Sequence, residues 1–73
     1  MQLLPMDIPA EIHRRIEVDG DVIVARGPLV IMAHGLLSLD PDARDTCWIH
    51  SELGDLSAAE AQDQLNRWST LTH

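Results

Sequence analysis

The segment GPLVIMAHGLLSLDP, residues 27–41, constrains the fold more than any other, because it can form either one helix or two strands. Pro28 suits the first turn of a helix, where a missing backbone N–H costs no hydrogen bond. Pro41 would end such a helix. One helical face would hold Leu29, Met32, Ala33 and Leu36. This spacing predicts a helix over residues 28–39.

The alternative is a pair of strands in the same segment. Val30 and Ile31 are β-branched, and Gly27 and Gly35 bracket the short apolar run that contains them. A second strand, LLSL, could then pair with TCWIH across the turn DPDARD. In that case the chain would be a small antiparallel sheet with one C-terminal helix.

A β-hairpin is expected just before this segment, within RRIEVDGDVIVAR. Its Asp-Gly dipeptide at residues 19–20 lies between β-branched residues, a pattern typical of a two-residue hairpin turn. In that register Val18 pairs with Asp21 across the hairpin, and Ile16 pairs with Ile23. One face of the hairpin then holds Ile16, Val18, Ile23 and Ala25.

A short N-terminal helix is also expected. Asp7 can cap it, Pro9 suits its first turn, and isoleucines recur at helical spacing at positions 8, 12 and 16. Ile16 belongs to the expected hairpin as well, so the boundary between this helix and the first strand stays open.

The residues after Asp40 predict another helix, over residues 41–53. Asp40 can cap it, Pro41 fits its first position, and Gly54 can end it. One line along this helix would contain Ala43, Cys47 and His50.

The clearest helix pattern lies at the C-terminus. Ser57 and Glu60 have the spacing of a capping box, which predicts a helix over residues 58–71. Asp63 and Arg67 are four residues apart and can form an ion pair. The apolar face of this helix would hold Ala61, Leu65, Trp68 and Thr72.

Together these elements predict an α+β fold. A chain of 73 residues is long enough for one domain, residues 1–73, with an antiparallel β-hairpin packed with about three helices. The sequence has two tryptophans and no phenylalanine or tyrosine. The core must therefore be aliphatic, with Trp48 and Trp68 as its largest residues.

The chain is strongly acidic. It has 12 Asp and Glu residues against 5 basic residues, all arginine, which gives a net charge of -7. This charge disfavours binding to phosphate backbones and anionic membranes and favours a basic partner surface. The longest apolar run, residues 29–33, is too short to span a membrane. The single cysteine fits a reducing compartment, so a cytoplasmic location is expected.

No catalytic or metal site is expected. The candidate ligands are His13, His34, Cys47, His50 and His73, and a structural zinc site needs two close pairs where only Cys47 and His50 form one. A cysteine beside Trp48 lacks the electropositive surroundings that would activate its thiolate. No glycine-rich phosphate loop is present. We therefore expect no catalytic residue, no metal, no cofactor and no enzymatic activity.

Two groups of carboxylates are the candidate partner-binding residues: Glu17, Asp19 and Asp21 around the hairpin tip, and Asp40, Asp42 and Asp45 at a helix start. Together they exceed what turns and caps require, and they could face an Arg- and Lys-rich groove. We expect a small protein-binding regulator, such as a phage-type or bacterial inhibitor that docks on a nucleic-acid machine. RNA polymerase is the first candidate partner, and direct binding to nucleic acid is not expected.

Other functions stay open. A hairpin with three helices is also compatible with a winged helix-turn-helix DNA-binding regulator, although the net charge argues against it. Its last helix would offer base contacts from Gln62, Gln64, Asn66 and Arg67. An inhibitor of a CRISPR effector complex and an antitoxin are further alternatives.

Overall fold

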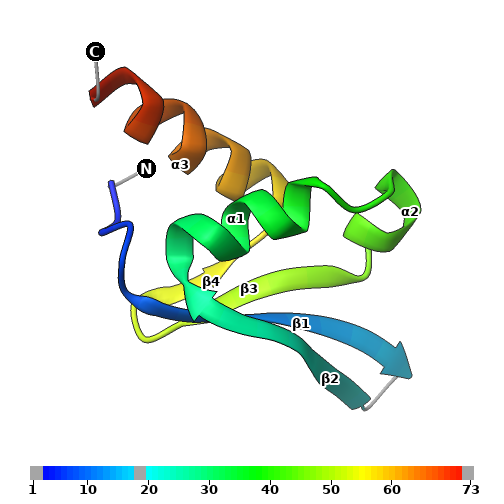
Figure 1. The fold of residues 1–73 in the computed structure, drawn as a ribbon. Helices are drawn as coiled ribbons and strands as arrows, with labels where there is room; N and C mark the ends of the chain where they lie inside the picture. The colour runs from blue at the N-terminus through cyan, green and yellow to red at the C-terminus, as the bar shows by residue number, and fades with distance from the viewer. Residues whose placement is uncertain (1–2, 18–19, 72–73) are drawn as a thin grey trace.

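The computed structural model describes residues 3–17 and 20–71 as a four-stranded antiparallel sheet with helices on one side (Figure 1). The strand order is β2-β1-β3-β4. Helices α1 and α3 lie along one face of the sheet, and α2 lies at one end of it. The α+β fold class is confirmed. In chain order the elements are β1 (Pro9–Glu17), β2 (Gly20–Pro28), α1 (Leu29–Leu37), α2 (Pro41–Arg44), β3 (Cys47–Ser51), β4 (Gly54–Leu56) and α3 (Ala58–Leu71).

The segment with two possible conformations is a helix, α1. Its first backbone N–H groups need acceptors from outside the helix. The N-terminal segment supplies them: Leu29 donates to the carbonyl of Ile8, and Val30 donates to the carbonyl of Met6, both at 2.9 Å. The expected helical face is confirmed, because the buried residues of α1 are Leu29, Met32, Ala33 and Leu36.

The expected N-terminal helix is wrong, because residues 9–17 form β1. This strand lies inside the sheet, between β2 and β3. Ala10 and Ile12 are buried, and they alternate with the less buried Glu11 and His13. Of the three isoleucines that indicated a helix, only the middle one is buried. Hydrogen bonding on both sides of the strand outweighed the local helical pattern.

The expected hairpin forms, but in a different register. Gly20 is already part of β2, opposite Glu17, and Ile23 lies opposite His13 instead of the expected isoleucine. Residues 18–19, which the expected register also involved, lie outside the described part of the chain.

A β-bulge in β2 puts Ile23 and Ala25 on different faces of the sheet. Ile12 faces Ala25 and the next residue, His13, faces Ile23, which leaves Val24 as an extra residue in β2. Directly opposed residues share a face of the sheet. Ala25 therefore lies on the helix-covered face with Ile12, whereas Ile23 lies on the other face with His13. The expectation that both belong to one face is wrong.

The helix expected over residues 41–53 is limited to its first turn, α2. Pro41 takes the first position as expected, and Asp40 precedes it without a side-chain hydrogen bond to the helix end. The side chain of Arg44 donates to the carbonyl of Leu39 at 3.1 Å.

The rest of that expected helix forms two strands. In β3, Cys47, Ile49 and Ser51 are buried and alternate with more exposed residues, which is the period of a strand. The strand alternative for TCWIH was therefore right, but β3 pairs with β1 and not with LLSL. Gly54 has a φ of 126° at the turn into β4, so it serves a tight turn and not a helix end.

Helix α3 follows the sequence pattern closely. The capping box is confirmed: the backbone N–H of Ser57 donates to Glu60 Oε1 at 3.0 Å, and that of Glu60 donates to Ser57 Oγ at 3.2 Å. Arg67 Nε donates to Asp63 Oδ2 at 2.8 Å, as expected. On the apolar face Ala61 is buried, Leu65 is partly buried, and Thr72 lies outside the described residues.

The N-terminal segment is bound to α3 by two hydrogen bonds. Trp68 is buried, and its indole Nε1 donates to the carbonyl of Leu4 at 2.8 Å. The backbone N–H of Leu4 donates to Oε1 of Gln64, which is fully buried, at 3.0 Å. Gln64 was counted among the residues that a DNA-binding helix would offer to bases, and its burial shows that it is not on the surface of α3.

The core lies between the sheet and the two longer helices. It contains Ala10, Ile12, Leu29, Met32, Ala33, Leu36, Cys47, Ile49, Leu56, Ala61 and Trp68. Trp68 is a core residue as expected, whereas Trp48 is only half-buried. Helix α1 approaches β1 closely at Gly35, where a Cβ atom would lie 3.4 Å from Cδ1 of Ile12.

Candidate protein-binding surface

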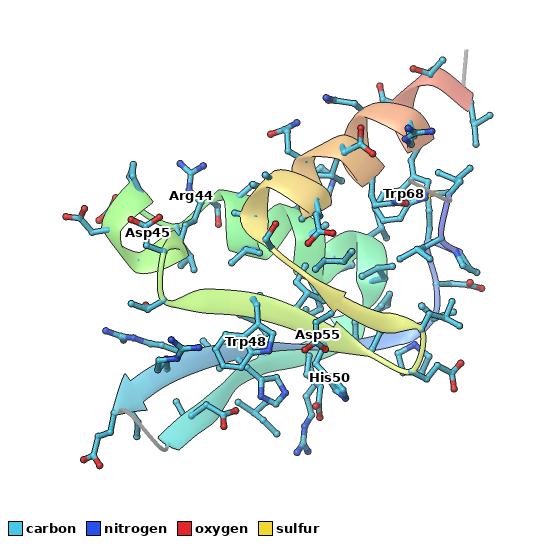
Figure 2. All side chains as sticks on the ribbon, turned by 180° about the vertical axis from the view of Figure 1, so that it is seen from behind. Arg44, Asp45, Trp48, His50, Asp55 and Trp68 are labelled. Carbon is cyan, nitrogen blue, oxygen red and sulfur yellow. The ribbon has the colours of Figure 1, made fainter. Side chains whose placement is uncertain are left out.

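The sheet face opposite the helices, called the outer face below, carries rings and charged side chains. Figure 2 shows Trp48 and His50 on this side of the sheet, away from Trp68 and α3. Among the described residues no helix covers it. The cross-strand pairs and side-chain contacts assign to it Glu11, His13, Arg15, Asp21, Ile23, Arg26, Trp48, His50 and Asp55.

Three rings meet at the centre of the outer face. His13 in β1 lies directly opposite Trp48 in β3, and their rings stack with centroids 5.6 Å apart and an interplanar angle of 26°. The ring of His50 meets that of His13 edge-on at 5.5 Å. The guanidinium of Arg15 lies 5.9 Å from the centroid of Trp48.

His13 is held between two carboxylates. Its Nδ1 lies 2.6 Å from Asp21 Oδ2, and its Nε2 lies 3.0 Å from Glu11 Oε1. A protonated imidazole can donate to both oxygens at once, whereas a neutral ring can donate to only one. The hydrogen bonds to Asp21 and then Glu11 raise the pKa of His13 above its ordinary value of 6.5. The pKa of Glu11 is lowered, first by its hydrogen bond with His13 and further by Arg26, whose Nε donates to Glu11 Oε2 at 3.0 Å.

Cys47 and His50, the expected close pair, do not form a shared site. They lie on opposite faces of β3: Cys47 is buried beneath the helices, and His50 is exposed on the outer face. His50 instead contacts Asp55, with Nδ1 2.6 Å from Oδ1. Within residues 3–17 and 20–71, no group of three or more His, Cys, Asp or Glu side chains is placed to hold a metal ion.

The structure brings the two expected carboxylate groups to the same end of the molecule. The end of β1, the start of β2 and α2 lie at the same end of the sheet in Figure 1. The backbone N–H of Arg15 donates to the carbonyl of Thr46 at 2.8 Å, which joins the end of β1 to the segment just after α2. Asp19 lies outside the described residues.

The carboxylates at this end differ in their bonding. Asp21 is occupied by His13 on the outer face. The other four, Glu17, Asp40, Asp42 and Asp45, are exposed, and their side chains make no hydrogen bond or ion pair with any other described residue. We call these four residues the acidic end. Arg14 and Arg15 lie between its two parts.

The polar residues of α3 that might contact DNA are bonded within the protein. Gln62 Nε2 donates to Asn66 Oδ1 at 3.0 Å, Arg67 pairs with Asp63, and Gln64 is buried against the N-terminal segment. None of these contacts tests binding to DNA, but each must be broken or rearranged for the side chain to reach a base.

The outer-face cluster was not anticipated from the sequence. Alternation in EIH and in CWIH could have placed His13 and Trp48 on one face, but only after both segments were taken as strands and paired. The helical interpretation of both segments separated these residues.

The part of the chain that the structure describes contains no helix long and apolar enough to cross a membrane. Comparison with known proteins places the chain in no family: no family model, curated protein sequence or solved structure matches it.

Proposed function

We propose that this chain is a small acidic regulator that binds a larger protein through the acidic end. The observation that carries the proposal is that four exposed carboxylates, from two segments far apart in the sequence, lie at one end of the molecule and bond to no other described residue. Unpaired carboxylates keep their full charge available to a partner, whereas an ion pair within the chain would offset it.

The physical basis is electrostatic attraction. With a net charge of -7, the molecule is drawn toward basic surfaces, and the unpaired carboxylates favour approach by the acidic end. Complementary charge of this kind mainly accelerates association and selects the orientation of docking. Arg14 and Arg15 between the two parts restrict which basic surfaces fit, because a partner must place its cations around them.

The partner class follows from this chemistry. Proteins that bind nucleic acid have basic grooves, and an acidic domain can occupy such a groove in place of phosphates. RNA polymerase is the first partner to test, followed by a CRISPR effector complex, and a cytoplasmic location accords with both. The winged-helix alternative has no comparable support, because the polar residues of α3 are bonded within the protein, to one another or to the N-terminal segment.

Affinity capture from a bacterial lysate, with mass spectrometry, tests the proposal when two matched variants are included. Asp42→Asn with Asp45→Asn removes two charges from the acidic end. Asp7→Asn with Glu52→Gln removes two exposed charges from the opposite end of the sheet, since Asp7 precedes β1 and Glu52 follows the β3 residue that pairs with Ala10. Both variants have the same net charge.

Capture of a protein with a basic surface, weakened several-fold in the first variant and little changed in the second, is the expected result. Surface plasmon resonance with the captured partner should show slower association of the first variant at low salt, and a smaller difference at high salt. Equal effects of both variants would mean that only total charge matters. Capture of duplex DNA in a parallel pull-down would favour the winged-helix alternative.

A further inference from the structure

Strand β2 is an exposed sheet edge with unusual features. It is nine residues long, and only β1 pairs with it among the described residues. Three consecutive apolar residues, Val22, Ile23 and Val24, have 42%, 42% and 53% of their surface exposed. The opposite edge strand, β4, has only three residues. Short edges resist pairing with other chains, whereas a long apolar edge invites it.

The sequence of β2 is complementary to itself when two copies run antiparallel. Its middle reads DVIVAR, with Asp21 at one end, Arg26 at the other and apolar residues between them. An antiparallel partner with the same sequence would set Asp21 opposite Arg26, Val22 opposite Ala25, and Ile23 opposite Val24. Each opposite-charge pair in such a ladder would be stabilising, and the pairing would contain two of them by symmetry.

The bulge in β2 makes this pairing geometrically consistent. Five positions separate Asp21 from Arg26, so a regular strand would place them on opposite faces. The extra residue Val24 interrupts the alternation, and both charges lie on the outer face: Asp21 contacts His13, and Arg26 contacts Glu11, which itself contacts His13. Val22 and Ala25 both lie on the helix side, opposite residues of β1 that share that face. The two outer pairs of the proposed ladder, Asp21 with Arg26 and Val22 with Ala25, therefore lie on matching faces, and the bulged residue lies at its centre.

The charged residues remain accessible despite their contacts within the chain. The side chain of Asp21 is 44% exposed and that of Arg26 is 69% exposed. Each can therefore contact a second group at the strand edge without leaving its first partner. Ile23 and Val24 would lose part of their exposure to water at the centre of the ladder, which supplies the hydrophobic part of the association.

We infer that β2 of one chain pairs antiparallel with β2 of a second copy, with Asp21 of each opposite Arg26 of the other, to form a symmetric dimer with one continuous sheet. This dimer would join the two outer faces side by side and leave both acidic ends exposed. The inference does not depend on the proposed function, because it uses none of the four residues of the acidic end.

The first test is the molar mass in solution, by light scattering and analytical ultracentrifugation over a wide concentration range. The full chain should reach a mass twice 8.1 kDa as concentration rises. Val24→Lys should give a monomer, because each lysine would face Ile23 of the other copy and bring two positive charges to the centre of the ladder. Ile31→Lys is the matched control: Ile31 is 54% exposed, close to the 53% of Val24, but lies on α1, so this variant should dimerise like the wild type.

The second test uses reversed charges. Asp21→Arg alone and Arg26→Asp alone each place like charges opposite one another twice, and each should weaken self-association roughly tenfold. A mixture of the two variants restores both opposite-charge pairs and should form a heterodimer. Circular dichroism must show that each variant keeps the wild-type fold.

Three results would overturn the inference. The wild type could stay monomeric at every concentration. The Val24→Lys variant could dimerise as well as the wild type, which would place the contact elsewhere. Alternatively, the mixture of charge variants could associate no better than either variant alone, which would exclude this register.

Discussion

The two faces of the sheet use the same strands for different purposes. On the inner face Ile12 and Ile49 lie opposite each other, and both are almost fully buried beneath α1 and α3. On the outer face the adjacent pair, His13 and Trp48, stacks two rings in contact with solvent. Moving one residue along either strand therefore changes an aliphatic core contact into a polar and titratable one.

This difference shows where stability and recognition reside in a domain of this size. A small domain buries only about 60% of its unfolded surface, so its few inner-face residues must supply most of its stability. The outer face is then free to hold groups that respond to charge and pH. Substitutions on the two faces should consequently have separate effects.

Adjacent residues of β3 give the largest expected contrast. Ile49→Ala removes a fully buried side chain at the centre of the sheet and should lower the free energy of unfolding by about 2–5 kcal/mol. His50→Ala removes an exposed side chain whose contact with Asp55 is a surface pair, and it should cost less than about 1 kcal/mol. Urea unfolding followed by circular dichroism measures both. Equal losses would show that the outer face also carries core stability.

Helix α3 allows a second comparison of buried and exposed positions. Gln64→Leu removes the acceptor for the backbone N–H of Leu4 and should cost about 1–3 kcal/mol. Gln62→Leu introduces a leucine at an exposed position of the same helix and should change stability by less than about 0.5 kcal/mol. A small effect of Gln64→Leu would mean that burial of leucine offsets the lost hydrogen bond.

The capping box should have a smaller effect, about 1 kcal/mol. Ser57→Ala removes the acceptor for the backbone N–H of Glu60 and the start of α3 would fray. Ser57→Asn should restore most of the loss, because asparagine caps about as well as serine. If alanine and asparagine destabilise equally, the hydroxyl has a role other than capping.

The smallest expected effect belongs to the outer face and depends on pH. Because the pKa of His13 is raised in the folded state, its contribution to stability is complete below its ordinary value of 6.5 and is lost as pH rises through the raised value. His13→Gln should remove this contribution, so the excess of the wild-type melting temperature over the variant's should be largest below pH 6.5 and should shrink as pH rises through the raised pKa of His13. Asp21→Asn removes the main partner and should flatten the same difference. If the difference in melting temperature between wild type and variant grew toward high pH, the pKa of His13 would not be raised in the folded state.

The sequence was most informative where a local pattern and the tertiary environment agree. Helix α3 has its capping box and its ion pair within one element, and α1 presents four apolar residues on one face, so both could be predicted. The strands β1 and β3 could not be predicted, because both segments also fit helices. The isoleucine spacing in β1 is helical, and Pro41 before β3 suits the start of a helix. Pairing between β1 and β3 selected the strands, and such a pairing involves residues about 35 positions apart.

The candidate surfaces follow the same rule. The two carboxylate groups were visible in the sequence as charge clusters, but their meeting at one end depends on the strand pairing. The cluster of His13, Trp48 and His50 was missed altogether, since it exists only when β1 and β3 are neighbours. The β2 register was missed because a bulge is a property of the paired ladder and not of either strand alone.

The positions of the two tryptophans give the molecule two distinct optical signals. With no tyrosine or phenylalanine in the chain, its near-ultraviolet absorption and fluorescence arise almost entirely from two indoles. Trp68 is buried and bonded to Leu4, so its emission follows the attachment of the N-terminal segment to α3. Trp48 is stacked on His13, so its emission follows the charge of that imidazole. Trp48→Phe would leave only the emission of Trp68, which follows the attachment of the N-terminal segment to α3. Trp68→Phe would leave only the emission of Trp48, which follows proton uptake by His13 on the outer face.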